Sequence, residues 1–155
     1  MMNINKASKL LNNLLSQTDK KSERKIYSCF IRTLSSLKDK DLTESQTQLI
    51  QEKLSTLNLN TTTENRKKYY NQKLSKFKTF LKDKFSFTSE KYYTEMGMIY
   101  GMSIGMSIGL SVGIAINPNF GTSIGLSIGI GAGMVLGMAY GAKKDSEAKR
   151  QGLVI

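Results

Sequence analysis

The stretch GMIYGMSIGMSIGLSVGIAINPNFGTSIGLSIGIGAGMVLGMAYGA, residues 97–142, carries glycine at every fourth position on both sides of its single proline. Pro118 is also the only proline of the chain, with five glycines of this repeat before it and six after it. From Met96 to Ala142 there is no Asp, Glu, Lys or Arg. This uncharged run is too long for the buried helix of a small soluble domain and is long enough for two membrane spans.

Residues 96–116 and 121–142 are the two predicted spans. At a rise of about 1.5 Å per residue, each crosses a hydrocarbon core of about 30 Å. Pro118 lacks a backbone N–H and disfavours helical geometry at Asn117, and the flanking asparagines favour a turn. A four-residue connection predicts an antiparallel pair of neighbouring helices with both chain termini on one side. The competing interpretation is a buried glycine-rich strand or amyloid-like segment. Glycine is poor in both helices and strands in water, and the four-residue spacing favours a setting that rewards close backbone approach.

The repeated glycines predict a surface for close helix packing. In lipid no hydrophobic force drives helices together, and small residues let their backbones approach closely. We call this GxxxG repeat the glycine ladder, and its members are Gly97, Gly101, Gly105, Gly109, Gly113, Gly121, Gly125, Gly129, Gly133, Gly137 and Gly141.

Further small residues follow two positions after the glycines, about 200° around the helix. We call the serines among them the serine face: Ser103, Ser107, Ser111, Ser123 and Ser127. A hairpin uses only one small face of each helix, so the serine face predicts packing against another copy, or the lining of a pore. The alternative is that each hydroxyl bonds to a carbonyl one turn back in its own helix.

Basic residues flank the uncharged run on both sides, whereas the predicted connection has no charge. These residues are Lys82, Lys84 and Lys91 before the run, and Lys143, Lys144, Lys149 and Arg150 after it. By the positive-inside rule both termini are expected in the cytoplasm. Tyr92, Tyr93 and Tyr140 fit an aromatic belt at the same interface.

Residues 1–60 predict three amphipathic helices that form a small bundle. The first is expected over 4–16 and the second over 22–37, and Thr43 is the candidate N-cap of the third. The residues predicted to face inward are Ile4, Ala7, Leu10, Leu11, Leu14 and Leu15 in the first helix, Ile26, Tyr27, Phe30, Leu34 and Leu37 in the second, and Leu49, Ile50, Leu54 and Leu57 in the third.

Residues 61–90 predict a basic amphipathic helix that begins near Thr62, with Thr61 and Glu64 as a capping box. Its apolar stripe is Tyr70, Leu74, Phe77, Leu81 and Phe85, widened by Tyr69 and Phe80. Residues 86–89 either interrupt it or continue it, and from Glu90 the chain is expected to feed directly into the first span. The residues expected to contact an anionic membrane leaflet are Arg66, Lys67, Lys68, Lys73, Lys76, Lys78, Lys82 and Lys84, with Lys143 and Lys144. A solvated face and a nucleic-acid surface are the alternatives, the latter least favoured.

Composition argues against catalysis. The chain has 155 residues, a formal net charge of +11, one cysteine and no histidine. Without histidine, Ser-His and Cys-His nucleophile pairs and common zinc sites cannot form. The glycine ladder is not followed by Lys-Ser or Lys-Thr, so it is not a phosphate-binding loop. We expect no enzymatic activity, no cofactor and no metal.

The two glycine-repeat spans, followed by AKKDSEAKRQGLVI, resemble bacterial glycine-zipper membrane proteins. The resemblance covers roughly residues 95–155 and implies close-packed, often oligomeric spans. We expect these spans in the bacterial inner (cytoplasmic) membrane, with residues 143–155 as a basic cytosolic tail. This packing motif serves channels, pore-forming toxins and anchors alike, so it indicates no single function.

The expected protein is all-α, with a cytosolic helical bundle followed by an antiparallel transmembrane hairpin over 91–142. The favoured function is a homo-oligomerising integral membrane protein, in its sharper form a pore, channel or membrane-permeabilising effector controlled by the cytosolic domain. One alternative is a membrane-anchored scaffold that recruits a cytosolic protein partner. A second is a membrane-tethered nucleic-acid binder. Constitutive and triggered insertion are both compatible with spans diluted by Gly, Ser and Met.

Overall fold

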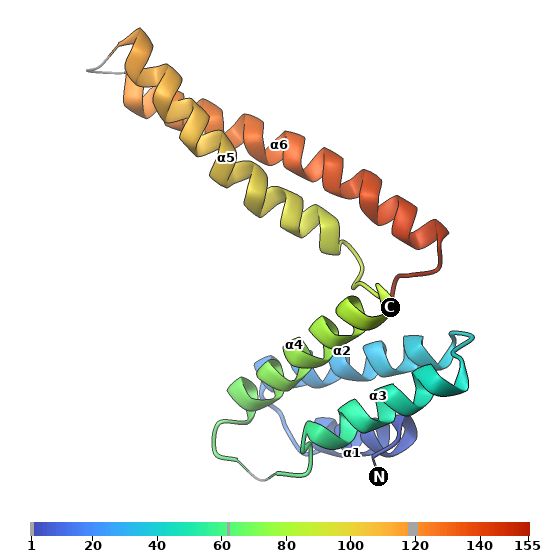
Figure 1. Cartoon of the computed structure of the whole chain (residues 1–155). Helices are drawn as coiled ribbons and strands as arrows, with labels where there is room; N and C mark the ends of the chain where they lie inside the picture. The colour runs from blue at the N-terminus through green and yellow to red at the C-terminus, as the bar shows by residue number, and fades with distance from the viewer. Residues whose placement is uncertain (1, 62, 118–120) are drawn as a thin grey trace. The chain divides into compact units, whose positions relative to one another are not determined.

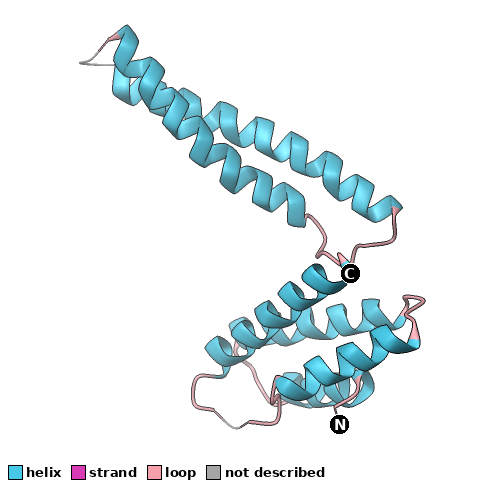
Figure 2. Cartoon of the chain, viewed as in Figure 1, coloured by secondary structure: helices cyan, strands magenta, loops and turns pink. Residues whose placement is uncertain are grey.

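The computed structural model describes residues 2–61, 63–117 and 121–155, and within these ranges it contains six helices (Figures 1 and 2). The chain divides into two compact units, residues 1–87 with Ile155, and residues 88–154. The all-α prediction is confirmed, as are two long apolar helices near the C-terminus. The helices are α1 (Ile4–Ser16), α2 (Lys21–Lys38), α3 (Glu44–Thr56), α4 (Arg66–Phe85), α5 (Tyr92–Ile116) and α6 (Gly121–Arg150).

Asparagine and threonine side chains cap the first and third helices. The side chain of Asn3 accepts a hydrogen bond from the Lys6 N–H at 2.7 Å and caps α1. Thr43 caps α3 in a capping box, because its hydroxyl accepts from the Gln46 N–H while the Gln46 side chain accepts from the Thr43 N–H. The predicted N-cap of the third helix is therefore confirmed.

The core of the first unit lies between α1, α2, α3 and α4. Phe30 of α2 and Phe77 of α4 are fully buried with ring centroids 5.6 Å apart. Tyr27 and Tyr70 meet edge to face at 5.1 Å. The remaining fully buried large side chains are Leu11, Leu34, Leu37, Ile50, Leu54, Leu59 and Leu81.

The inward placement of Leu49 is wrong, because this side chain is 44% exposed. The buried stripe of α3 runs through Ile50 and Leu54 and continues to Leu57 just after the helix. Leu49 lies one residue, or about 100°, away from Ile50 around the helix and therefore leaves the stripe.

The predicted start of the basic helix is also wrong. Helix α4 begins at Arg66, and its N-cap is Asn65, whose side chain accepts from the Lys68 N–H at 3.2 Å. The proposed capping box is wrong because the helix starts well after Thr61, whose hydroxyl donates to the carbonyl of Asn58. Asparagine is among the strongest N-cap residues, which explains why Asn65 takes this role. Thr62 lies outside the described residues.

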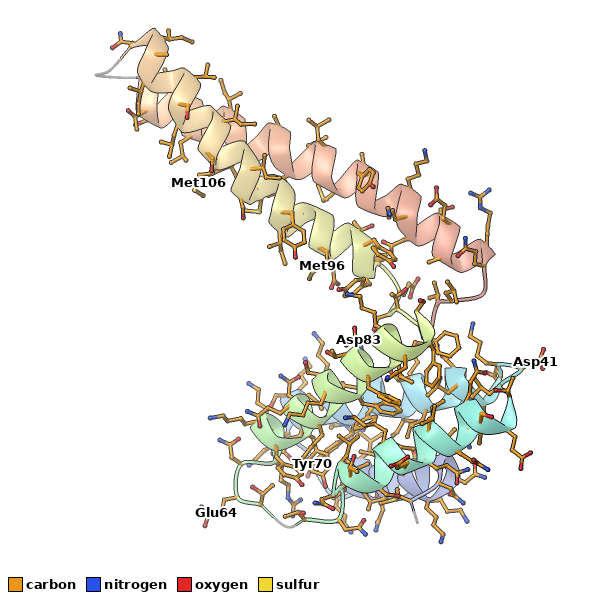
Figure 3. All side chains as sticks on the ribbon, viewed as in Figure 1. Asp41, Glu64, Tyr70, Asp83, Met96 and Met106 are labelled. Atoms are coloured by element: carbon orange, nitrogen blue, oxygen red, sulfur yellow. The ribbon has the colours of Figure 1, made fainter. Side chains whose placement is uncertain are left out.

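Two tyrosines of α4 fix the segment that precedes it. The Tyr69 hydroxyl donates to the Asn58 carbonyl and the Tyr70 hydroxyl to the Leu59 carbonyl, both at 2.7 Å. Burial, followed by the nearby phenols of Tyr27 and Tyr69, raises the pKa of Tyr70 from 10.0 to about 12. Figure 3 shows Tyr70 among the side chains of the helical bundle. These two bonds thereby tie Asn58 and the fully buried Leu59 to α4.

Residues 86–89 interrupt the helix after Phe85. Ser86 has a left-handed conformation with φ of 59°, which ends α4, and Lys91 has a similar φ of 61° just before α5. The continuous alternative is therefore wrong, and the interruption is confirmed. From Glu90 the chain turns through Lys91 into α5, which begins at Tyr92 and runs without a break into the predicted span.

Helix α6 is longer than its predicted span. It continues through Lys143 and Lys144 to Arg150, so most of the expected tail is helical. Beyond it Gly152 has φ of +70°, and the Leu153 carbonyl accepts from the Thr88 N–H at 2.9 Å. The predicted turn at Pro118 falls on residues 118–120, which lie outside the described residues.

Candidate functional site: the glycine ladder and its ends

Helices α5 and α6 lie side by side and meet through the glycine ladder (Figure 1). A Cβ atom built on Gly105 would overlap the carbonyl oxygen of Gly129 and lie 3.0 Å from the Cα of Gly133. One built on Gly109 would overlap the Gly125 carbonyl and lie 2.9 Å from the Gly129 Cα. The contact is backbone on backbone, so no side chain larger than hydrogen fits without moving a helix.

The pairing of the ladder follows a simple order. Gly97, the first ladder residue of α5, faces Gly137, near the end of the ladder in α6. Gly113, the last in α5, faces Gly121, the first in α6. Gly141 differs from the others because a Cβ there would overlap the backbone of Tyr93 and Thr94. The structure therefore places all eleven predicted packing glycines in the α5–α6 interface.

Gly131 provides the contrast within the same helix. A Cβ added to it meets nothing within 4 Å, because Gly131 lies two positions from the ladder on the outer side of α6. The close approach is thus specific to the four-residue repeat.

The serine face is exposed on the outer sides of both helices. In α5 the hydroxyls of Ser103, Ser107 and Ser111 each donate to the carbonyl four residues earlier, at 3.0, 3.1 and 2.9 Å. In α6 Ser127 donates to the Ser123 carbonyl at 2.9 Å. These four hydroxyls are used within their own helices, and the face they leave is small and only weakly polar.

Sequence reasoning missed one residue of this unit, Asp145. Its Oδ1 accepts from the Tyr93 N–H at 2.9 Å, and its Oδ2 accepts from the Thr94 N–H at 2.8 Å and the Thr94 hydroxyl at 2.6 Å. The residue at the N-cap position of α5, Lys91, makes no side-chain capping bond. Asp145 therefore caps α5 from the other helix and places negative charge at its positive end.

A signal for Asp145 was present in the repeat. It lies four residues after Gly141 and thus occupies the next position of the ladder on α6. Tyr93 lies four residues before Gly97 and occupies the matching position on α5. A carboxylate at the end of a packing face beside a helix N-terminus is an expected cap. Asp145 was overlooked because the residues around it are mostly basic.

The basic residues of α4 lie away from its buried stripe, and Lys67, Lys68, Lys76, Lys82 and Lys84 are exposed while Arg66, Lys73 and Lys78 are half-buried. The Lys73 ammonium lies 4.8 Å from the centre of the Tyr69 ring, and Lys78 donates to the Sγ of Cys29 at 3.5 Å. Lys143 and Lys144 are exposed on α6.

Both α5 and α6 are long and apolar enough to cross a membrane by length and composition, a test that buried core helices also pass. Here little of their apolar length is buried. Exposed side chains include Ile104 at 61%, Ile128 at 66% and Leu136 at 71%. Figure 3 shows side chains projecting outward along both helices, Met106 among them. Soluble monomers rarely expose apolar patches larger than a few hundred Å².

Within residues 2–61, 63–117 and 121–155 no group of three His, Cys, Asp or Glu side chains is placed to hold a metal ion. Comparison of the chain with protein-family models, curated proteins and solved structures gives no match in any of the three.

Proposed function

We propose that the chain is an integral membrane protein whose α5 and α6 form an antiparallel transmembrane hairpin that assembles into a homo-oligomer, as in the bacterial glycine-zipper proteins it resembles. The supporting observation is the contrast between the two kinds of surface on these helices. The small ladder face is occupied within the pair, whereas the large apolar side chains face outward. Lipid accommodates such side chains, and water does not.

The proposed location is the bacterial inner membrane with both termini in the cytoplasm, supported by the basic residues that flank the spans. Single cysteines at Asn60 and Ser146, in a Cys29→Ser background, test the orientation with a membrane-impermeant maleimide. Both positions are expected to react from the cytoplasmic side alone. Labelling of the two from opposite sides would exclude a hairpin with both ends on one side.

The homo-oligomer is supported by the exposed serine face, a second small surface outside the ladder. Leucine at Ser107 and Ser127 together is expected to lower the oligomer size measured in detergent by light scattering. Leucine at Ile104 and Ile128, which lie on other faces of the same helices, is the matched control. Equal oligomer size for both double variants would argue against assembly through the serine face.

In its sharper form the assembly is a pore or a membrane-permeabilising effector controlled by the first unit. The observed hydroxyls donate within their own helices, so in a narrow pathway lined by serines they offer ions and water their oxygen lone pairs. Ion flux through liposomes that contain the purified full chain tests this form. Tight liposomes with confirmed insertion would contradict it and leave the hairpin intact.

A second candidate function is a membrane-anchored scaffold, supported by the first unit's own buried core around Phe30 and Phe77. Its exposed lysines suit the anionic leaflet beside the spans. In this case vesicle flux is absent and a cytosolic protein co-purifies with the wild-type chain. A nucleic-acid partner is distinguished by binding that falls steeply with salt concentration.

A further inference from the structure

The ladder forms the floor of a long apolar groove on one side of the α5–α6 pair. Its walls stand three residues after the glycines and include Ile104, Ile108 and Val112 from α5 and Ile124, Ile128 and Leu136 from α6. The groove encloses about 1110 Å³ and is lined almost entirely by apolar atoms. Because the floor consists of glycine backbone, the space between the walls is open along the length of the pair.

A different set of side chains, one residue after the glycines, stands on the opposite side of the ladder. Met102, Leu110, Leu126, Met134 and Met138 are half-buried there, whereas Met98, Met106 and Ile114 are exposed. Methionine is flexible and fills irregular gaps, whereas the β-branched isoleucines of the groove walls are stiff. The methionine-rich side is therefore more deformable than the groove walls.

The two ends of the groove differ in charge. Lys144, Tyr93 and Tyr140 line one end, with the Lys144 ammonium 5.7 Å from the centre of the Tyr140 ring. Ile116 and Asn117 line the opposite end, and neither is charged. A ligand that matches these surfaces is apolar over most of its length and carries a negative group at one end.

We propose that this groove binds one acyl chain of an anionic phospholipid, with the lipid phosphate at Lys144 and the chain along the glycine floor. The inference rests on the proposed membrane hairpin. A second copy is the less suitable occupant, because two hairpins in the same orientation that pair groove to groove by two-fold symmetry bring their Lys144 side chains to the same end. The like charges repel there, whereas a phosphate neutralises the lysine.

The proposal is tested with two matched pairs of variants of the full chain. Ala132 lines the groove, whereas Ala139 is also exposed but lies outside its lining, so Ala132→Phe is compared with Ala139→Phe. Lys144 lines the groove and its neighbour Lys143 does not, so Lys144→Gln is compared with Lys143→Gln. Each protein is reconstituted in vesicles of phosphatidylcholine mixed with phosphatidylglycerol and extracted gently, and its bound lipids are counted by native mass spectrometry.

Wild type is expected to retain phosphatidylglycerol in preference to phosphatidylcholine. Lys144→Gln lowers the apparent affinity for phosphatidylglycerol about fivefold, the loss expected for one lysine near an anionic surface, and Lys143→Gln leaves it unchanged. Ala132→Phe lowers retention of both lipids because the ring fills the groove, and Ala139→Phe matches wild type.

Flotation of each variant with its vesicles separates failure of this inference from failure of the proposed function. A wild-type chain that does not float overturns the membrane hairpin itself. If all variants float but Ala132→Phe retains as much lipid as Ala139→Phe, the bound lipid is not in the groove and the inference is overturned. It is also overturned if Ala132→Phe reduces the oligomer size without changing bound lipid, because the groove is then occupied by another copy.

Discussion

In the first unit α2 and α4 meet through the rings of Phe30 and Phe77, whereas in the second α5 and α6 meet through glycine backbone. The first contact removes large apolar surface from water, which is the main source of stability for a soluble core. The second contains almost no side chains and depends on close approach of the helices. The two contacts should therefore respond oppositely to changes in side-chain size.

The largest effect is expected from enlarging a ladder residue. Gly129→Leu places a side chain where even a Cβ overlaps the Gly105 carbonyl, and neither backbone yields cheaply. We expect the two helices to separate, and the free-energy cost of the substitution to exceed the about 1–3 kcal/mol of ordinary overpacking. Spin labels at Ile104 and Leu136, on opposite walls of the groove, measure the separation by electron paramagnetic resonance in a Cys29→Ser background.

Gly131→Leu is the control for this experiment, because a side chain at Gly131 meets no neighbour. It should leave the distance between the spin labels unchanged. An equal change in the distance between the spin labels in both variants would mean that leucine disturbs α6 itself. The backbone contact would then not explain the effect.

In the first unit the destabilising change is a smaller side chain, because its core is filled by large ones. Phe77→Ala removes a fully buried ring and leaves a cavity, at an expected cost of about 3–5 kcal/mol. Leu49→Ala, on the exposed side of α3, should cost no more than about 0.5 kcal/mol. Urea unfolding of the full chain in detergent, followed by circular dichroism, measures both values. Similar midpoints for the two variants would contradict the position of the core.

A smaller effect is expected at the cap of α5. Asp145→Ala removes three hydrogen bonds and a negative charge from the N-terminus of that helix, and the expected loss of stability is about 1–2 kcal/mol. Glu147→Ala removes the same charge two residues further along α6 and is the control. Hydrogen exchange at the Tyr93 and Thr94 amides should accelerate in the first variant alone. Unchanged protection would show that the carboxylate does not hold α5.

The smallest effect concerns two buried phenols. Tyr70→Phe loses the hydrogen bond to the Leu59 carbonyl, worth about 1 kcal/mol near neutral pH. The Tyr27 hydroxyl is buried without a hydrogen-bond partner in the described part of the chain, so Tyr27→Phe should be neutral or stabilising. Thermal unfolding of the two variants at neutral pH compares them. An equal loss in both would contradict this difference in bonding.

Tyr70 also makes the stability of the fold depend on pH. The folded-state pKa of Tyr70 is raised to about 12 from 10.0, so the folded protein keeps a proton that the unfolded chain releases. Its contribution is complete below pH 10 and is lost as pH rises toward 12. The difference in stability between wild type and Tyr70→Phe should therefore shrink over this range, and a constant difference would contradict the shift.

Features that depend on one chain segment were predictable from sequence. The boundaries of α1, α2 and α3 follow from apolar spacing and from caps such as Thr43, whose bonds stay within a few residues. The glycines of the ladder share one face of each helix for the same reason. Prediction failed where neighbouring signals compete, as when Asn65 rather than Thr61 caps α4. It also failed at Asp145, because its role depends on which part of α5 lies opposite the end of α6.

The repeated spacing of the glycines has a consequence for sliding. A shift of α6 along α5 by one repeat of four residues, about 6 Å, brings most ladder glycines opposite another glycine, so most of the contact looks the same after the shift. The bonds from Asp145 to Tyr93 and Thr94 occur only once along the pair and are lost in the shifted arrangement. The Asp145 carboxylate thus fixes the register of the two helices. It selects one among several nearly equivalent alignments that the glycines alone do not distinguish.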